Sequence, residues 1–142
     1  LEQAKKYDLE EILVNHGYIS RVDSIKLQKN SRYLILSTWN SKDEIGVFPG
    51  KFLEYMLIGK PIISIVDGNL PNSEVTQVMS EGNLGISYES ARHDIDYYNL
   101  KQYIKIEYNR FKEGLESDFR PNKNVIDRYN YENIAMQFRE LF

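Results

Sequence analysis

The segment Gly46–Val66, GVFPGKFLEYMLIGKPIISIV, places charged residues in the first turns of an otherwise apolar helix. Pro49 and Gly50 directly precede Lys51. The start of a helix exposes unpaired backbone amides and carries about half a positive charge, so it attracts phosphate. Gly50 allows a ligand to approach the backbone closely. Lys51 adds a positive charge that is unfavourable at this end of a helix unless an anion binds there.

Glu54 follows Lys51 by one helical turn and is suited to the sugar next to such a phosphate. Helical side chains lean toward the N-terminus, so we expect its carboxylate to reach the helix opening. There it can accept hydrogen bonds from a diol, as acidic residues do for ribose in dinucleotide-binding folds. Together these features describe a site for a nucleoside diphosphate. The alternative is that Lys51 and Glu54 form an ordinary ion pair on a solvated helix face.

The hydrophobic pattern predicts the elements that must position these residues. The segment RYLILSTW is continuously apolar from Tyr33 to Leu36 and then has small polar residues, which is typical of a strand buried on both faces of a parallel sheet. Strands are predicted over 11–19, 32–39, 61–66 and 83–89, and helices over 20–30, 51–58, 73–82, 96–111 and 130–142. Because strands alternate with helices, we expect an α/β fold, a Rossmann-like three-layer sandwich with a parallel sheet. Ligands of such folds bind outside the carboxyl ends of the strands.

Residues at the predicted helix ends support these boundaries. Ser20 with Asp23 resembles a capping box, and Ser73 and Asn130 can cap the helices that follow them. Gly59 can adopt the left-handed conformation that ends a helix. In the long helix 96–111, five residues fall at helical spacing and are expected to lie in the core or at its rim: Leu100, Tyr103, Ile104, Tyr108 and Phe111. In the last helix, Ile134, Phe138 and Leu141 are expected to face inward.

Composition excludes several classes of function. The chain has 142 residues, enough for one domain with a core, and its net charge of −3 gives no reason to expect nucleic acid as a partner. The absence of cysteine excludes disulfides and thiolate metal sites, and the two histidines, His16 and His93, argue against a histidine-rich metal site. No apolar run reaches the length of about 20 residues that a membrane helix needs. The chain starts at Leu1 without a methionine, and we expect a fragment of a longer protein.

The segment GVFPGKFLEYMLIGKPIISIV resembles the donor-binding motif of GT-B glycosyltransferases, in the branch that reads roughly fPgKlfEYlaaGkPil. Upstream, HGYISRVDSIKLQKNSRYLIL resembles the strand end, helix and apolar strand of that family, and VMSEGNLGISYE resembles a later segment. The similarity covers most of Ile12–Tyr88. The central motif combines seven residues in one register: Gly46, Pro49, Lys51, Glu54, Tyr55, Gly59 and Pro61.

The resemblance implies that residues 1–142 form a single domain, the C-terminal half of a two-domain GT-B enzyme that binds the nucleotide-sugar donor. The full-length enzyme would transfer the sugar to a glycan or polysaccharide acceptor, whereas the isolated fragment would be inactive. Glu54 matches the glutamate that binds the ribose hydroxyls, the backbone amides around 48–51 would face the diphosphate, and 17–19 would lie beside the base. The implied donor-binding residues are Glu54, Lys51, Gly50, Pro49, Phe48, Gly46, Glu44, Gly17, Tyr18 and Ile19.

The chain departs from the family pattern in three respects. Many members carry an earlier glutamate, and counting back from Glu54 by the family's spacing leads to Gly46, with Glu44 as the nearby substitute. The phosphate-binding arginine or lysine of the family usually lies in an earlier strand–helix unit, upstream of Leu1. The acceptor half, which would hold any catalytic base, is absent, so the catalytic residues are unknown.

The resemblance also implies partners and a location. The partners are a nucleoside-diphosphate sugar and a glycan or lipid-linked acceptor, the latter bound through a missing N-terminal domain. We expect no cofactor, no metal and no nucleic acid. A cytoplasmic location is expected, with peripheral association at the inner face of a membrane. Two alternatives stay open: a nucleotide-sugar epimerase of the same architecture, and a non-catalytic interaction domain that has lost its ligand.

Four further residues at the predicted ligand edge are weaker candidates. Ser41 or Lys42 can contact phosphate, because both follow the strand at 32–39. Asp67-Gly68 can contact the donor sugar, yet it suits a plain turn equally well.

Overall fold

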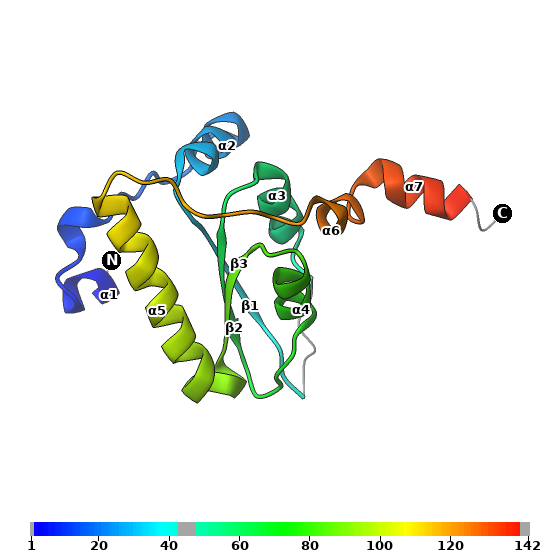
Figure 1. Cartoon of the computed structure of the whole chain (residues 1–142). Coiled ribbons are helices and arrows are strands. Elements are labelled where there is room, and N and C mark those ends of the chain that lie inside the picture. Colours follow the sequence, from blue (N-terminus) through cyan, green and yellow to red (C-terminus); the bar gives the residue numbers. More distant parts are fainter. Residues whose placement is uncertain (1, 43–47, 140–142) are drawn as a thin grey trace.

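The computed structural model describes residues 2–42 and 48–139 (Figure 1). Within them, three parallel strands form one sheet in the order β1 (Leu34–Trp39), β2 (Ile62–Asp67), β3 (Gly85–Glu89). The helices are α1 (Glu2–Lys6), η1 (Glu10–Ile12), α2 (Arg21–Asn30), α3 (Gly50–Ile58), α4 (Glu74–Glu81), η2 (Ser90–Arg92), α5 (His93–Lys112), α6 (Lys123–Asp127) and α7 (Tyr131–Arg139). The expected α/β class with a parallel sheet is confirmed.

The helices lie on both faces of the sheet. Figure 1 shows α3 and α4 on one face and α5 on the other. The face toward α3 and α4 holds the core, because every second residue of β1 points into it and is buried. The core residues are Leu36, Phe52, Met56, Ile62, Val75, Val78, Met79, Leu84 and Val125. This arrangement is compatible with a Rossmann-like fold.

Several predicted helix ends are confirmed. Ser20 Oγ accepts a hydrogen bond from the Asp23 amide at 3.1 Å, and Ser73 Oγ accepts one from the Thr76 amide at 3.2 Å. Gly59 has a φ of 71° and ends α3 in the left-handed conformation. These caps satisfy backbone groups that a helix end would otherwise leave unpaired.

The predicted strand over 11–19 is wrong. Residues 10–12 form η1, and the side chains of Ile12 and Val14 are 76% and 70% exposed. The segment then turns at Gly17, which has a φ of 60° and donates its amide to Asn15 Oδ1 at 2.9 Å. A strand needs a neighbour to pair with, and within the described chain β1 pairs with β2 alone. The described residues therefore form three strands instead of the expected four.

Helix α5 has an exposed apolar face next to the uncovered side of β1. Ile104, Tyr108 and Phe111 are 47%, 59% and 59% exposed and lie at the rim, and Ile35 of β1 is 66% exposed. Between α5 and the sheet lies a groove of about 400 Å³, lined by Tyr33, Ile63, Tyr103 and the rim residues. α5 packs chiefly on β3, so the half of this face that belongs to β1 is left open. The expected burial of this strand on both faces is therefore wrong, because its alternate residues are exposed.

The last described helix, α7, projects from the body of the domain (Figure 1). The predicted cap is confirmed, since Asn130 Oδ1 accepts a hydrogen bond from the Glu132 amide at 3.0 Å. The predicted inner face is not covered: α7 has no buried residue, and Phe138 is 62% exposed. Leu141 lies outside the described residues.

Among residues 2–42 and 48–139, no helix combines the length and the apolar character that crossing a membrane requires.

Candidate functional site

The opening of α3 has no side-chain cap. Its N-cap residue is Pro49, in extended backbone conformation, and the Phe52 amide donates to the Pro49 carbonyl at 2.8 Å. The amides of Gly50 and Lys51 find no acceptor among the described residues. A Cβ placed on Gly50 would meet no atom within 4 Å, so there is open space beside this residue. The first turn of α3 thus exposes the donors that an anion binds.

Glu54 and Lys51 form an ion pair at this opening. Lys51 Nζ lies 2.8 Å from Glu54 Oε1, and the two side chains are 48% and 28% exposed. Lys51 Nζ also lies 5.5 Å from the centre of the Tyr55 ring. The contact joins Glu54 to a residue of the first turn, and whether its carboxylate reaches a ligand at the helix opening stays a prediction. The ordinary surface pair considered from the sequence is therefore present, and Lys51 would have to share its hydrogens with any bound phosphate.

A second residue, Gln28 of α2, also binds Glu54. Gln28 Nε2 donates to Glu54 Oε1 at 2.7 Å and to Ser24 Oγ at 3.1 Å. Hydrogen bonds from Lys51 and Gln28 lower the pKa of Glu54, and the positive charge of Arg21 acts in the same direction. The sequence reasoning missed Gln28. The signal available was spacing, because Arg21, Ser24 and Gln28 recur on one face of α2.

Other predicted donor-binding residues lie apart from this cluster or serve the core. The Phe48 ring packs on Phe52 with centroids 5.1 Å apart and stacks on Tyr129 at 5.3 Å, so only its backbone remains for a ligand. The 17–19 segment is not a strand end but an exposed stretch before α2, and none of its residues hydrogen-bonds to α3 in the described structure. Glu44 and Gly46 lie outside the described residues.

The loops after β1 and β2 are joined by structural hydrogen bonds. The amide of the buried Asn40 donates to the Asp67 carbonyl at 2.7 Å, and the Lys42 amide donates to Asn69 Oδ1 at 3.0 Å. Gly68 has a φ of 117°, and a Cβ there would lie 2.2 Å from the Asn40 carbonyl oxygen. The plain-turn interpretation of Asp67-Gly68 is thus sufficient, because close backbone packing by itself requires glycine.

The opening of α4 is occupied by a carboxylate of the chain itself. Glu89 is fully buried and accepts hydrogen bonds from the amides of Asn72 at 2.7 Å and Ser73 at 2.8 Å. Burial raises the pKa of Glu89, but the hydrogen bonds outweigh this effect, and its pKa is below the ordinary value. The backbone amide of Glu89 in turn donates to Asp96 Oδ2 at 3.1 Å. Glu89 thus fills the place that a bound anion would take.

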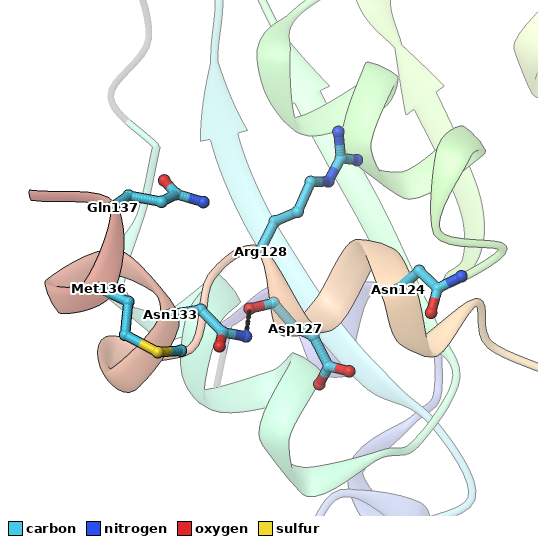
Figure 2. Close-up of a pocket in the computed structure, with 6 residues that line it drawn as sticks. All are labelled: Asn124, Asp127, Arg128, Asn133, Met136 and Gln137. Carbon is cyan, nitrogen blue, oxygen red and sulfur yellow. Dashed lines mark hydrogen bonds between the residues drawn. The ribbon is translucent and has the colours of Figure 1, made fainter. Parts of the chain in front are cut away.

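A shallow pocket between α6 and α7 offers no concentrated charge (Figure 2). It measures about 350 Å³ and is lined by Asn124, Asp127, Arg128, Asn133, Met136 and Gln137. Asn133 Nδ2 donates to the Asp127 carbonyl at 2.7 Å, and Arg128 is paired with Glu81. In the part of the chain that the structure describes, no group of three or more histidine or acidic residues could hold a metal ion.

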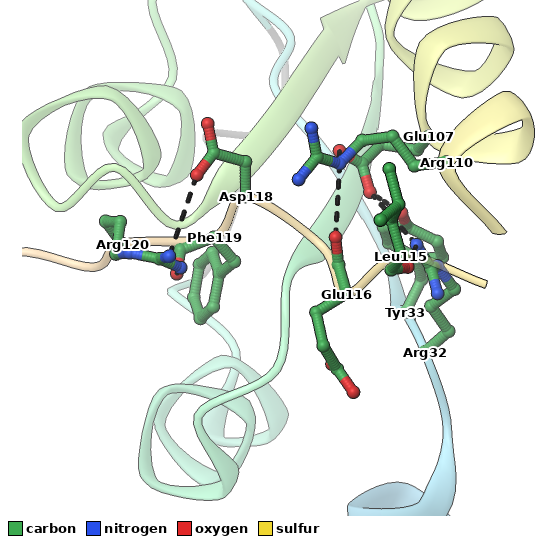
Figure 3. Close-up of polar contacts among 9 residues, drawn as sticks. All are labelled: Arg32, Tyr33, Glu107, Arg110, Leu115, Glu116, Asp118, Phe119 and Arg120. Atoms are coloured by element: carbon green, nitrogen blue, oxygen red, sulfur yellow. Dashed lines mark hydrogen bonds and ion pairs between the residues drawn. The ribbon is translucent and has the colours of Figure 1, made fainter. Parts of the chain in front are cut away.

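A polar cluster at the amino edge of the sheet has a structural role (Figure 3). The Tyr33 hydroxyl donates to Glu107, which is buried, and Arg32 Nη2 lies 3.8 Å from the same carboxylate. Arg32 Nη2 also donates to the Leu115 carbonyl at 2.9 Å. Burial raises the pKa of the neighbouring Tyr103 to about 12. The cluster therefore ties α5 and the chain after it to the start of β1.

Comparisons with known proteins found no relative: no family model, no curated protein and no solved structure matches the chain. The class that the described residues themselves define is an α/β domain with a three-stranded parallel sheet, in which helix α3 begins without a side-chain cap.

Proposed function

We propose that this chain is the donor-binding domain of a GT-B glycosyltransferase and binds a nucleoside-diphosphate sugar at the opening of α3. The finer description of the fold, the C-terminal half of a GT-B enzyme, belongs to the same proposal. The observation that carries it is the Glu54 carboxylate, held at an uncapped helix opening by residues of two helices. The motif Gly46–Val66 supplies the resemblance to the enzyme family.

The chemistry of the site agrees with that ligand. A diphosphate would accept hydrogen bonds from the amides of Gly50 and Lys51, which find no acceptor among the described residues, and would interact with the positive end of α3. Glu54 Oε2 accepts no hydrogen bond from any described residue, so it is available to a ribose hydroxyl. In the full-length enzyme, stabilisation of the departing diphosphate by this opening would contribute to transfer of the sugar to its acceptor.

Titration of the 142-residue chain with UDP and GDP, followed by calorimetry, tests the proposal. We expect saturable binding of one of them by the wild type and affinity about tenfold lower in Glu54→Gln, because a hydrogen bond to a charged acceptor is lost. Glu81→Gln is the matched control, since Glu81 is also an exposed helical glutamate in an ion pair. An absence of saturable binding by the wild type contradicts the proposal.

A non-catalytic interaction domain is the second candidate, and the apolar groove beside α5 favours it. An interaction domain needs an exposed apolar surface, and Ile35, Tyr108 and Phe111 provide one. The titration separates the two candidates, because this second function requires no nucleotide.

A further inference from the structure

Gln28 places both hydrogens of its side-chain amide on polar partners. One is donated to Glu54 Oε1 at 2.7 Å and the other to Ser24 Oγ at 3.1 Å. The side chain is 8% exposed, so this arrangement is covered from solvent. The contact joins residues 26 positions apart and fixes the Glu54 carboxylate against α2.

The carbonyl oxygen of the same amide is left without a partner. Gln28 Oε1 is buried and makes no hydrogen bond in the described structure. A buried unpaired carbonyl destabilises a fold, and an apolar side chain of the same length would avoid that cost. Rotating the amide by half a turn would place this oxygen against the Glu54 carboxylate, which is unfavourable. In its observed orientation, Gln28 hydrogen-bonds to Glu54 through Nε2 and leaves its own Oε1 without a partner.

The two carboxylate oxygens of Glu54 differ in their hydrogen bonds to the described residues. Oε1 accepts hydrogen bonds from both Gln28 and Lys51, at 2.7 and 2.8 Å. Oε2 accepts none from a described residue. A carboxylate held at one oxygen by two donors keeps its orientation and presents the other oxygen to a ligand.

We propose that Gln28 is a positioning residue, which holds Glu54 Oε1 and so leaves Oε2 to bind the ribose diol of a nucleoside diphosphate. The inference rests on the proposed function, because it concerns recognition of the ribose at the same site. It extends that site to α2, a helix from which the sequence motif named no ligand-binding residue. It also makes Gln28 a determinant of preference for ribose over deoxyribose.

A double-mutant cycle tests the proposal on the 142-residue chain. UDP and 2′-deoxy-UDP are titrated into the wild type, Gln28→Met, Glu54→Gln and the double variant. We expect Gln28→Met to weaken UDP binding about tenfold and 2′-deoxy-UDP binding less, because it disturbs the acceptor of the diol. In the Glu54→Gln background the same substitution is expected to change affinity by less than about twofold, since it acts through Glu54.

Gln102→Met is the matched control, because Gln102 lies on α5 and is not among the described residues that hydrogen-bond within this cluster. It is expected to bind UDP as the wild type does. Thermal unfolding distinguishes a folding defect from a binding defect. Gln28→Met is expected to unfold within about 3 °C of the wild type, because loss of the unpaired carbonyl offsets loss of the bond to Glu54.

Two results would overturn the inference about Gln28 without affecting the proposed function. Equal weakening of UDP and 2′-deoxy-UDP by Gln28→Met would show that Gln28 does not act on the ribose. A full effect of Gln28→Met in the Glu54→Gln background would show that it does not act through Glu54. A wild-type chain that binds no nucleotide overturns the proposed function itself, and the inference with it.

Discussion

The helix openings of α3 and α4 follow neighbouring strands of the same sheet, yet they are completed in opposite ways. At α4, Ser73 caps the helix and the buried Glu89 accepts hydrogen bonds from two backbone amides. At α3, Pro49 provides no side-chain cap, and the first turn contains a lysine and no acidic residue. The same backbone feature is completed by side chains of the chain at α4, whereas at α3 no described side chain caps it.

The two openings differ because the nearby glutamate belongs to a different element in each case. Glu89 ends β3 and reaches the amides before α4 across 16 or 17 positions of sequence, so it is part of the fold. Glu54 lies inside α3 and is directed toward α2, so the amides at the start of α3 are not satisfied by it. A helix with an unsatisfied opening and a lysine there loses stability unless an anion binds. The comparison therefore assigns a structural role to Glu89 at α4 and agrees with the proposal that the opening of α3 binds a ligand.

The largest expected effect is that of Glu89→Ala on stability. The substitution leaves two backbone amides without a partner and opens a cavity in a fully buried site, so we expect the free energy of unfolding to fall by about 3–5 kcal/mol. Urea denaturation measures it. Glu54→Ala is the matched comparison and should lose less, about 1–2 kcal/mol, because that carboxylate is partly exposed and only the Gln28 amide loses a buried partner. Similar losses at both sites would contradict the division between the two openings.

The free energy of unfolding should also depend on pH through the Glu89 carboxylate. The folded-state pKa of Glu89 is below its ordinary value of 4.5, so its contribution to stability is complete above about pH 4.5 and is lost as pH falls through the folded pKa. In that interval the wild type should lose up to about 1.4 kcal/mol per pH unit more than Glu89→Gln, which has no proton to bind at this position. Urea denaturation from pH 6 to pH 3 measures the difference. Parallel curves would show that folding does not lower the pKa of Glu89, which contradicts the prediction.

A substitution that adds a side-chain cap to α3 should make its opening resemble that of α4. Pro49→Asp adds a side-chain cap and a negative charge at an N-cap whose φ of −71° and ψ of 135° suit aspartate. We expect UDP affinity to fall about tenfold, because the new carboxylate competes for the amides that a diphosphate would use. Calorimetry measures the affinity. Ser73→Ala is the control: it removes the α4 cap, lowers stability by about 1 kcal/mol and leaves affinity unchanged.

Much of the framework was predictable from local patterns. The strands at Leu34–Trp39 and Ile62–Asp67 are rich in apolar residues, and α3 ends at a glycine where its sequence predicts. The α/β class follows from their alternation with helices. The strand over 11–19 was wrong because an apolar run becomes a strand only beside an available edge. A single sequence does not say which neighbours that run will have.

The residues that distinguish the two openings were harder to predict. Gln28 and Glu54 are 26 positions apart, and Glu89 lies 16 positions from Ser73. Neither contact falls on a helical or strand repeat within one element, so no periodic pattern identifies it. Lys51 and Glu54 were recognisable because both lie on the same helix at a spacing that brings side chains together.

The smallest expected effect on stability is that of Lys51→Met. This variant tests whether Lys51 at the α3 opening, unlike Glu89 at the α4 opening, affects binding more than stability. The exposed Lys51–Glu54 pair contributes about 0.2–0.5 kcal/mol, as i,i+3 pairs on helices do, so unfolding in urea should change by no more than that. UDP affinity should fall further, by about tenfold, because a phosphate would lose its direct cationic partner. A stability loss of several kcal/mol with unchanged affinity would make Lys51 a structural residue like Glu89. The two openings would then no longer differ in kind, since each would be completed by the chain itself.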